Sequence, residues 1–284
     1  MTLGPSLSYE VFPPRTPQGE RALASTIEKL NSIEPVMVSV TYGAGGADKE
    51  RSFAAVDLAA RYAECPVAAH LTCVGVPRVA VDEVVDRYLE LGVRHIVALR
   101  GDPPEGIDAV YRSHPDGFDS TAQLVKAIRD RASAAGVEVM ISVSAYPEVH
   151  PQSPHLAHDL DVLEAKVAAG ANRAMTQMFF RTEAMRTYLA ALRDRNISTP
   201  VIPGIMPVHD LARVTTFAER CGATIPDELI SHFAGTQDSH EAAVSWASQQ
   251  IVELHAAGID EFHLYTLNKP DLVIDIANRL KEIS

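Results

Sequence analysis

The chain has 284 residues, 46% hydrophobic and 22% charged, close to globular averages, which excludes a disordered, collagen-like or coiled-coil protein. Its 25 basic and 37 acidic residues give a net charge of −12, so we expect no binding of nucleic acid or anionic membrane through bulk charge. The three cysteines form no CxxC pair, which favours reduced thiols in the cytoplasm. We expect neither a signal peptide nor a membrane-spanning segment.

Short apolar runs recur along the chain, most of them about thirty residues apart, which is the length of one strand–helix unit. We predict eight strands, at Leu7–Phe12, Val36–Thr41, Val67–Leu71, His95–Leu99, Val137–Val143, Arg173–Gln177, Val201–Ile205 and Glu261–Leu264. The segments between them have the periodicity of amphipathic helices, for example Val81–Leu91 and Leu156–Ala169. Glycines suited to end a helix follow several of these segments, namely Gly92, Gly136, Gly170 and Gly258.

This alternation of strand and helix predicts an α/β fold with parallel strands. Eight units can close into a (β/α)8 barrel of TIM type, and we expect residues 1–284 to form one such catalytic domain. A doubly wound open sheet is the competing architecture, but no GxGxxG motif follows the first strand, and Gly43–Gly46 does not match one. The wide gaps at Gly101–Gly136 and Pro207–Gly258 predict additional loops or helices within the domain.

Polar and aromatic side chains follow the predicted strands, at the ends that build the active site of a barrel. Taken singly, each has a plain structural explanation, because a lone glutamate in a strand is usually paired or solvated and a lone histidine usually belongs to the core. Their common position at one rim predicts a shared site. These residues are Glu10, Thr41, His70, Arg100, Asp102, Tyr146, His150, Gln177, Tyr265 and Lys269.

The residue types at this rim indicate a chemistry. Glu10 follows an apolar strand, so burial is expected to raise the pKa of its carboxyl and make it a candidate general acid. No HExxH motif or paired CxxC is present, so a catalytic metal is not expected. This set of residue types fits redox chemistry on a large anionic heterocycle. Candidates to bind its phosphates or carboxylates, or to stack on its rings, are His70, Arg100, His150, Lys166, Lys269, Tyr146 and Phe217.

The same residues lie in segments that resemble the bacterial single-domain type of methylenetetrahydrofolate reductase, in family order and over nearly the whole chain. The segments are Tyr9–Arg15, Val38–Ala44, His70–Cys73, Arg94–Asp102, Ala145–Pro151, Ala169–Ala174, Thr176–Gln177, Pro203–Pro207 and Phe262–Asn268. The resemblance implies a (β/α)8 barrel that reduces 5,10-methylenetetrahydrofolate to 5-methyltetrahydrofolate, which supplies methyl groups for methionine synthesis. In most members, a bound FAD takes hydride from NAD(P)H and passes it on.

The resemblance also implies roles for individual residues. Glu10 matches the general acid, which would protonate N5 of the folate so that its five-membered ring opens to an iminium. Asp102 matches an aspartate near the flavin and the pterin, Gln177 a pterin contact, and Phe217 an aromatic residue shared by the nicotinamide and folate sites. Tyr265 and Lys269 are expected on the folate side. The flavin-contacting positions are Thr41, His70, Arg100, Gly101, Tyr146, His150, Asp159 and Lys166.

The chain departs from the family pattern mainly where the adenosine and pyrophosphate of FAD would bind. A family Tyr-Ala is replaced within Ser120–Val125, and the usual Asn and Arg are Val162 and Ala165, which cannot hydrogen-bond or pair with a phosphate. The segment Pro103–Phe118 is extended. On the folate side, Arg213 replaces a glutamine and Lys269 an arginine, and the effect of these two changes on folate binding stays open.

Two mechanisms therefore compete. Either NADH donates hydride directly to the folate without a bound flavin, which the lost contacts favour, or FAD still binds and the kinetics are ping-pong. A third interpretation is a folate-binding barrel without activity of its own, or one that needs a redox partner, and Glu10 argues against it. A fourth is a different flavin barrel, such as a proline-oxidising enzyme, which would not require the set Glu10, Asp102 and Gln177. NADPH is not excluded, the oligomeric state is open with a monomer plausible, and no regulatory domain is expected.

Overall fold

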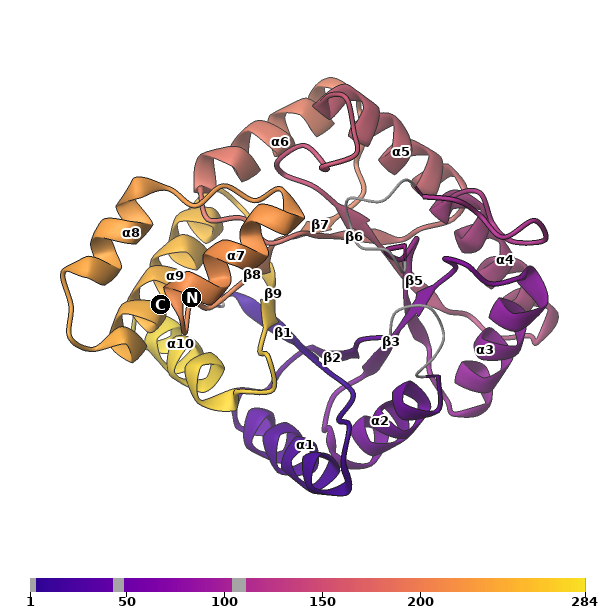
Figure 1. Cartoon of the computed structure of the whole chain (residues 1–284), viewed down its shortest axis with the longest axis horizontal. Coiled ribbons are helices and arrows are strands. Elements are labelled where there is room, and N and C mark those ends of the chain that lie inside the picture. The colour runs from indigo at the N-terminus through magenta and orange to yellow at the C-terminus, as the bar shows by residue number, and fades with distance from the viewer. Residues whose placement is uncertain (1–3, 43–48, 104–110, 284) are drawn as a thin grey trace.

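The computed structural model describes residues 4–42, 49–103 and 111–283, and a ring of parallel strands forms its centre (Figure 1). In spatial order the strands run β7-β6-β5-β4-β3-β2-β1-β9-β8, and every pair is parallel. Pro203 alone separates β7 from β8, so the two ends of this order meet and the sheet closes into a barrel. The strands are β1 (Ser6–Val11), β2 (Met37–Val40), β3 (Val67–Thr72), β4 (His95–Leu99), β5 (Met140–Ala145), β6 (Arg173–Thr176), β7 (Val201–Ile202), β8 (Gly204–Ile205) and β9 (Glu261–Tyr265).

Helices surround the strands, and α7 lies over β8 in Figure 1. Apart from α7 and α8, their apolar faces are buried against the outside of the sheet, as their periodicity predicts. The short 3-10 helix Asn31–Ile33 follows α1. The α-helices are α1 (Pro17–Leu30), α2 (Lys49–Tyr62), α3 (Arg78–Glu90), α4 (Thr121–Ala134), α5 (Leu156–Ala168), α6 (Thr182–Asp194), α7 (Leu211–Cys221), α8 (Asp227–Ala234), α9 (Ser239–Ala256) and α10 (Pro270–Ile283).

Successive strand residues point alternately into the barrel and out to the helices, because the side-chain period of a strand is two. The outward residues join the main hydrophobic core. Inside the barrel, an apolar layer is formed by Met37, Ala68, Val97, Met175 and Ile202. A third apolar cluster lies beneath α7 and α8; it contains Met178, Phe180, Met206, Val208, Val214, Ala218, Cys221, Ala223 and Leu229.

The predicted barrel is confirmed, with two corrections to the strands. The fifth strand begins at Met140 rather than Val137, because the Val137 amide donates to the carbonyl of Ala132 and so belongs to the end of α4. The seventh strand is two short pieces, because Pro203 has no amide hydrogen to continue the ladder. Most of the other strand ends differ by a residue from the predicted ones, the usual uncertainty of such boundaries.

The remaining fold predictions have mixed outcomes. The wide gaps do hold additional helix, with α7, α8 and α9 between Pro207 and Gly258. The glycines predicted to end helices all have a positive φ: Gly92, Gly136, Gly170 and Gly258. Residues Gly43–Gly46, and Pro104–Val110 of the extended segment, lie outside the described residues. Among the helices of the described ranges, none is long and apolar enough to cross a membrane.

Candidate active site

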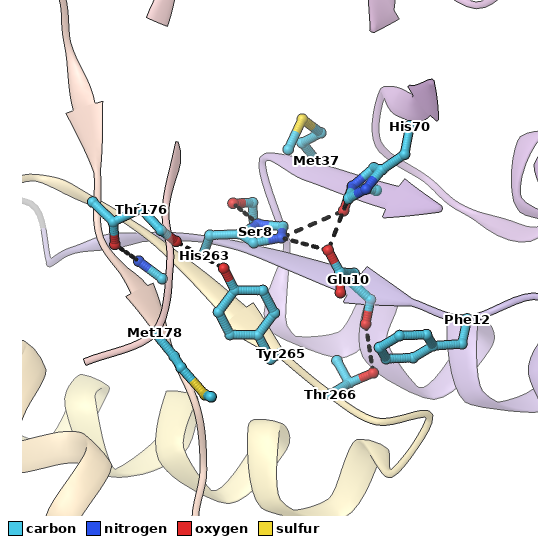
Figure 2. Close-up of polar contacts among 12 residues, drawn as sticks. Ser8, Glu10, Phe12, Met37, His70, Thr176, Met178, His263, Tyr265 and Thr266 are labelled. Carbon is cyan, nitrogen blue, oxygen red and sulfur yellow. Dashed lines mark hydrogen bonds and ion pairs between the residues drawn. The ribbon is translucent and has the colours of Figure 1, made fainter. Parts of the chain in front are cut away.

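Glu10 lies near the C-terminal end of β1, and its side chain points into the barrel (Figure 2). Only 7% of the residue is exposed. Its Oε2 atom lies 3.4 Å from Nε2 of His70 on β3 and 4.0 Å from Nε2 of His263 on β9. Three strands that are far apart in sequence therefore bring one carboxyl and two imidazoles together.

Two serines complete what we call the Glu10 cluster, which consists of Ser8, Glu10, Ser39, His70 and His263. Ser39 Oγ lies 3.2 Å from Nε2 of His70 and 3.4 Å from Nε2 of His263, and Ser8 Oγ lies 2.8 Å from Nδ1 of His263. Strand register explains this arrangement, because Ser39 is opposite Glu10 on β2 and His263 is opposite Ser8 on β9. All these side chains are held by rigid strands rather than by loops.

Burial controls the protonation of this cluster. It raises the pKa of Glu10 from its ordinary 4.5 to about 8, because a carboxylate loses its hydration there. Burial also lowers the pKa of His70 to about 4 and that of His263 well below its ordinary value. Near neutral pH, Glu10 therefore keeps its proton between two neutral imidazoles. The expectation that burial raises the pKa of Glu10 is confirmed.

The backbone beside Glu10 is fixed to the last strand of the barrel. Thr266 Oγ1 donates to the Glu10 carbonyl at 2.6 Å (Figure 2). The Asn268 side chain both accepts from the amide of Phe12, at 2.8 Å, and donates to its carbonyl, at 3.0 Å. Leu267 and Asn268 have positive φ values, so this turn adopts a conformation that few L-residues favour. These bonds hold the first and last strands in register where the acid lies.

Tyr265 is positioned by a glycine on the neighbouring strand. Its hydroxyl donates to the carbonyl of Thr176 at 2.7 Å, and the Gly204 amide donates to Thr176 Oγ1 at 2.8 Å. A Cβ atom on Gly204 would lie 2.4 Å from the Thr176 carbonyl oxygen and 2.6 Å from the Tyr265 hydroxyl. Only glycine therefore leaves room for the tyrosine ring at this point.

The remaining residues predicted on the substrate side are more accessible. Gln177, directly after β6, is half-buried, and its Oε1 accepts from the amide of Met178 at 3.0 Å. Asp102 and Lys269 are exposed, and Phe217 on α7 is 48% exposed. Arg213 is also exposed and pairs with Asp210 at the start of α7. The structure thus places these groups at or after strand ends or on α7, and their side chains are more exposed than those of the Glu10 cluster.

Four predicted cofactor contacts, together with Tyr111, form a second group beyond β4. We call it the Arg100 cluster, and it consists of Arg100, Tyr111, His150, Asp159 and Lys166. The Arg100 guanidinium lies 4.9 Å from the centre of the Tyr111 ring and also donates to Gln152. Asp159 Oδ2 accepts from the His150 amide at 2.9 Å, and Lys166 donates to both oxygens of Ser144. Burial, and then the charge of Arg100, lower the pKa of His150.

Three further cofactor predictions concern the strand ends. Gly101 has a φ of +86°, and a Cβ there would lie 2.6 Å from Val74 Cγ1, so glycine is required by both conformation and space. Thr41 follows β2, and its amide donates to the Val11 carbonyl at 3.0 Å. The Tyr146 ring packs edge-to-face against His150, with centroids 4.6 Å apart. His70, which is also predicted as a flavin contact, belongs to the Glu10 cluster.

Sequence reasoning missed several residues of the site. Ser8, Ser39 and His263 were not singled out, although the period of two along β1, β2 and β9 places them on the same inner face as Glu10. Tyr111 and Gln152 were not predicted either. Both contact Arg100 from loops, and no local sequence pattern indicates such contacts.

Comparison with known proteins decides the family. The methylenetetrahydrofolate reductase model matches residues 3–281. The chain belongs to this family. It is 36% identical to 5,10-methylenetetrahydrofolate reductase of Pectobacterium carotovorum subsp. carotovorum and 34% identical to that of Escherichia coli, over 97% of this chain and 90% of each relative. It is 32% identical to methylenetetrahydrofolate reductase (NADH) 1 of Arabidopsis thaliana, of which it covers 48%.

The resemblance found in the sequence is thereby confirmed, and the chain is an oxidoreductase of the methylenetetrahydrofolate reductase family. Solved structures support the barrel alone. An oxaloacetate acetylhydrolase aligns with a TM-score of 0.57 at 13% identity, covering 99% of this chain and 80% of its own. Dihydropteroate synthase from Stenotrophomonas maltophilia aligns with a TM-score of 0.56 at 14% identity, covering 99% and 93%.

Members of this family commonly bind FAD, and the residues present fit that group only in part. The Arg100 cluster offers cationic and hydrogen-bonding groups for one part of a dinucleotide. Val162 on α5 is 39% exposed, and Ala165 on the same helix is also exposed. Neither side chain has a polar atom that could bind the adenosine diphosphate part of FAD. Gln123 is already engaged, because it accepts from Arg78 and from the Asp119 amide. The set of contacts for a whole FAD is therefore incomplete.

Proposed function

We propose that the chain reduces 5,10-methylenetetrahydrofolate to 5-methyltetrahydrofolate with hydride from NADH, without a bound flavin, and with Glu10 as the general acid. The observation that carries the acid role is the buried carboxyl of Glu10, which keeps its proton near neutral pH because burial raises its pKa to about 8. A protonated carboxyl in a buried site can donate to a substrate nitrogen, whereas an ionised one cannot.

The bonds of the reaction define what the acid must do. The methylene carbon stays on N5 in the product, so its bond to N10 breaks and one proton ends on N10. N5 uses its lone pair to form the iminium as N10 leaves, so a proton placed first on N5, as the resemblance implies, has to leave N5 before the ring opens and end on N10. The iminium carbon formed on N5 accepts hydride from C4 of the nicotinamide. One hydride and one proton are consumed, NADH becomes NAD⁺, and Glu10 is reprotonated from solvent.

Other residues are proposed to orient the two substrates. Gln177 and Tyr265 would contact the pterin, Asp102 would stabilise the positive charge of the iminium, and Lys269 would bind a carboxylate of the folate. Phe217 on α7 would stack against the nicotinamide and folate rings. The Arg100 cluster, with Thr41, Gly101 and Tyr146, would contact the dinucleotide.

Support for direct transfer from NADH comes from the incomplete FAD contacts at Val162, Ala165 and Gln123. The name of the Arabidopsis relative specifies NADH, which favours NADH over NADPH here. An FAD-dependent, ping-pong version of the same reaction is the second candidate, favoured by the retained Arg100, His150, Asp159 and Lys166. Cytoplasmic location stays a prediction that rests on the free thiols of Cys65, Cys73 and Cys221.

The test is an absorption spectrum of gently purified protein from about 300 to 550 nm, followed by anaerobic NADH oxidation with methylenetetrahydrofolate. We expect no flavin band, and NADH oxidation that requires folate and is unchanged by added FAD. A stoichiometric flavin band that NADH alone bleaches would replace direct transfer by the FAD-dependent mechanism. Absence of turnover with and without FAD would contradict the proposed activity and favour a folate-binding barrel that depends on a redox partner.

A further inference from the structure

The Glu148 carboxylate joins three segments at the C-terminal end of the barrel. Glu148 belongs to the loop after β5, and only 13% of its side chain is exposed. Its Oε1 pairs with Nη2 of Arg181, the residue before α6, at 2.8 Å. Its Oε2 accepts from the backbone amide of Thr224, just after α7, at 2.9 Å. We call this set of contacts the Glu148 bridge.

The end of α7 packs closely on the loop that carries Glu148. Gly222, with a φ of +72°, ends the helix, and a Cβ on it would lie 3.0 Å from Pro151 Cγ and 3.3 Å from the Val149 carbonyl oxygen. The Ala223 amide closes the helix by donating to the Ala218 carbonyl. The helix end and the β5–α5 loop are therefore in contact, with a directed hydrogen bond beside the contact.

This end of α7 is also close to the proposed site. Burial, followed by the charge of Asp102, raises the pKa of the Cys221 thiol to about 11, so Asp102 and the last turn of α7 are electrostatic neighbours. Phe217 lies one turn before Cys221 on the same helix. A shift of α7 would therefore move Phe217 relative to Asp102.

A second attachment of α7 is apolar. Val214, Ala218 and Cys221 bury one face of the helix in the cluster beneath it. Apolar contacts hold a helix against a surface but are not directional, so they fix its position along its own axis less well than a hydrogen bond does. The Glu148 bridge supplies directed bonds at the end of α7 that neighbours Asp102.

We propose that Glu148 is a positioning residue, which fixes α7 and thereby places Phe217 for substrate binding. This inference rests on the proposed function, because it assigns Phe217 to the nicotinamide and folate rings. The bridge differs from an ordinary surface ion pair, which contributes little. Each carboxylate oxygen has its own directed donor, and one of these donors is a backbone amide whose position defines the chain after α7.

The test is a double-mutant cycle on steady-state kinetics, with Glu148→Gln, Glu148→Ala, Phe217→Ala and the two combinations. We expect Glu148→Ala to lower kcat/KM about tenfold, mostly through a higher KM for NADH and folate, because a charge-assisted bond to the helix end is lost. Glu148→Gln, which keeps one acceptor oxygen, should fall between the wild type and Glu148→Ala. In the Phe217→Ala background, both Glu148 substitutions should have no further effect.

The matched control is Glu241→Gln, which removes an ion pair to Arg279 between α9 and α10 and should leave the kinetics unchanged. Thermal unfolding shows whether each variant is folded. If Glu148→Ala does not fold, Arg181→Met removes only the ion pair and should give a smaller rise in KM that again vanishes with Phe217→Ala.

Effects of Glu148 substitution that persist unchanged in the Phe217→Ala background would overturn the positioning role. So would kinetics no different from those of Glu241→Gln. Both results leave the proposed reduction intact, because they require an active wild type. An inactive wild-type protein would instead contradict the proposed function, and with it the assignment of Phe217 on which the inference rests.

Discussion

The Glu10 cluster and the Arg100 cluster lie at the same end of the barrel but are built differently. Ser8, Glu10, Ser39, His70 and His263 all belong to strands, and strand register sets their contacts. In the Arg100 cluster, Tyr111 and His150 belong to loops, while Asp159 and Lys166 belong to α5. One cluster is therefore fixed by the sheet, and the other depends on how loops and a helix pack on it.

The departures from the family pattern follow this division. Val162 and Ala165 lie on α5, and the segment Ser120–Val125 covers the start of α4, whereas Glu10, the proposed acid, lies on β1. Loops and helix surfaces accept substitution more easily than an interior strand face, where each side chain has close neighbours. The proposed acid is therefore held by the sheet, and the proposed change of hydride source concerns loops and helix surfaces.

The largest expected effect is that of Glu10→Gln. The amide keeps the shape but has no acidic proton, so turnover should fall about a thousandfold, within the range of general acid catalysis. Folate binding should persist. The measurement combines NADH oxidation with equilibrium binding of the folate product, and near-normal turnover in this variant would remove Glu10 from the mechanism.

The strand-built side should also be intolerant of added volume. Gly204→Ala places a methyl group 2.4 Å from the Thr176 carbonyl oxygen and 2.6 Å from the Tyr265 hydroxyl. The free energy of unfolding should therefore fall by about 2–3 kcal/mol. The control is Gly235→Ala, whose nearest neighbour would be 3.6 Å away and whose φ is −83°. Denaturant titration of both variants should separate them clearly, and equal stabilities would show that the Tyr265 contact is not tightly packed.

The pH dependence of activity should report the protonation of Glu10. Because the acid form is active and its pKa is about 8, kcat/KM should fall tenfold per pH unit above that value. Burial lowers the pKa of Lys166 to about 8 as well, so Lys166→Gln is the control. The alkaline fall should persist in this variant, and its disappearance there would assign the fall to the lysine.

The same pKa changes predict opposite effects on stability. The folded protein holds the Glu10 proton more tightly than the unfolded chain, so this contribution is complete below pH 4.5 and is lost as pH rises through about 8. His70 is neutral in the folded state above a pKa of about 4, so its contribution is lost as pH falls from 6.5 to about 4. In denaturant titrations, the free energy of unfolding of the wild type should fall with rising alkaline pH, and that of Glu10→Gln should not. An equal fall in both proteins would contradict this prediction.

A smaller effect is expected on the loop-built side. The double substitution Val162→Asn and Ala165→Arg restores two polar side chains, and each should tighten FAD binding about tenfold through a new hydrogen bond or ion pair. Ala168→Arg places the same charge at an exposed position of α5 and serves as the control. Fluorescence titration with FAD measures the change, and equal affinity in all three proteins would mean that these positions do not decide flavin binding.

The sequence predicted the barrel and Glu10 because their signals are local: an apolar strand every thirty residues or so, and a glutamate at the end of one. His263 was not predicted, because its partner Ser8 is 255 residues away in the sequence and only closure of the barrel brings β9 beside β1. Pro203 was visible in the sequence, yet whether it ends a strand or divides one depends on the neighbouring strands. The contact of Tyr111 with Arg100 likewise depends on loop packing, which no periodicity encodes.

The most direct test of the account is a ¹³C NMR titration of the Glu10 carboxyl, in protein labelled at its glutamate side chains and with Glu10→Gln to assign the resonance. The account predicts a carboxyl that stays protonated through neutral pH and titrates near pH 8. A resonance that titrates near the ordinary value of 4.5 would mean that Glu10 is ionised at working pH, and would contradict its role as the proton donor.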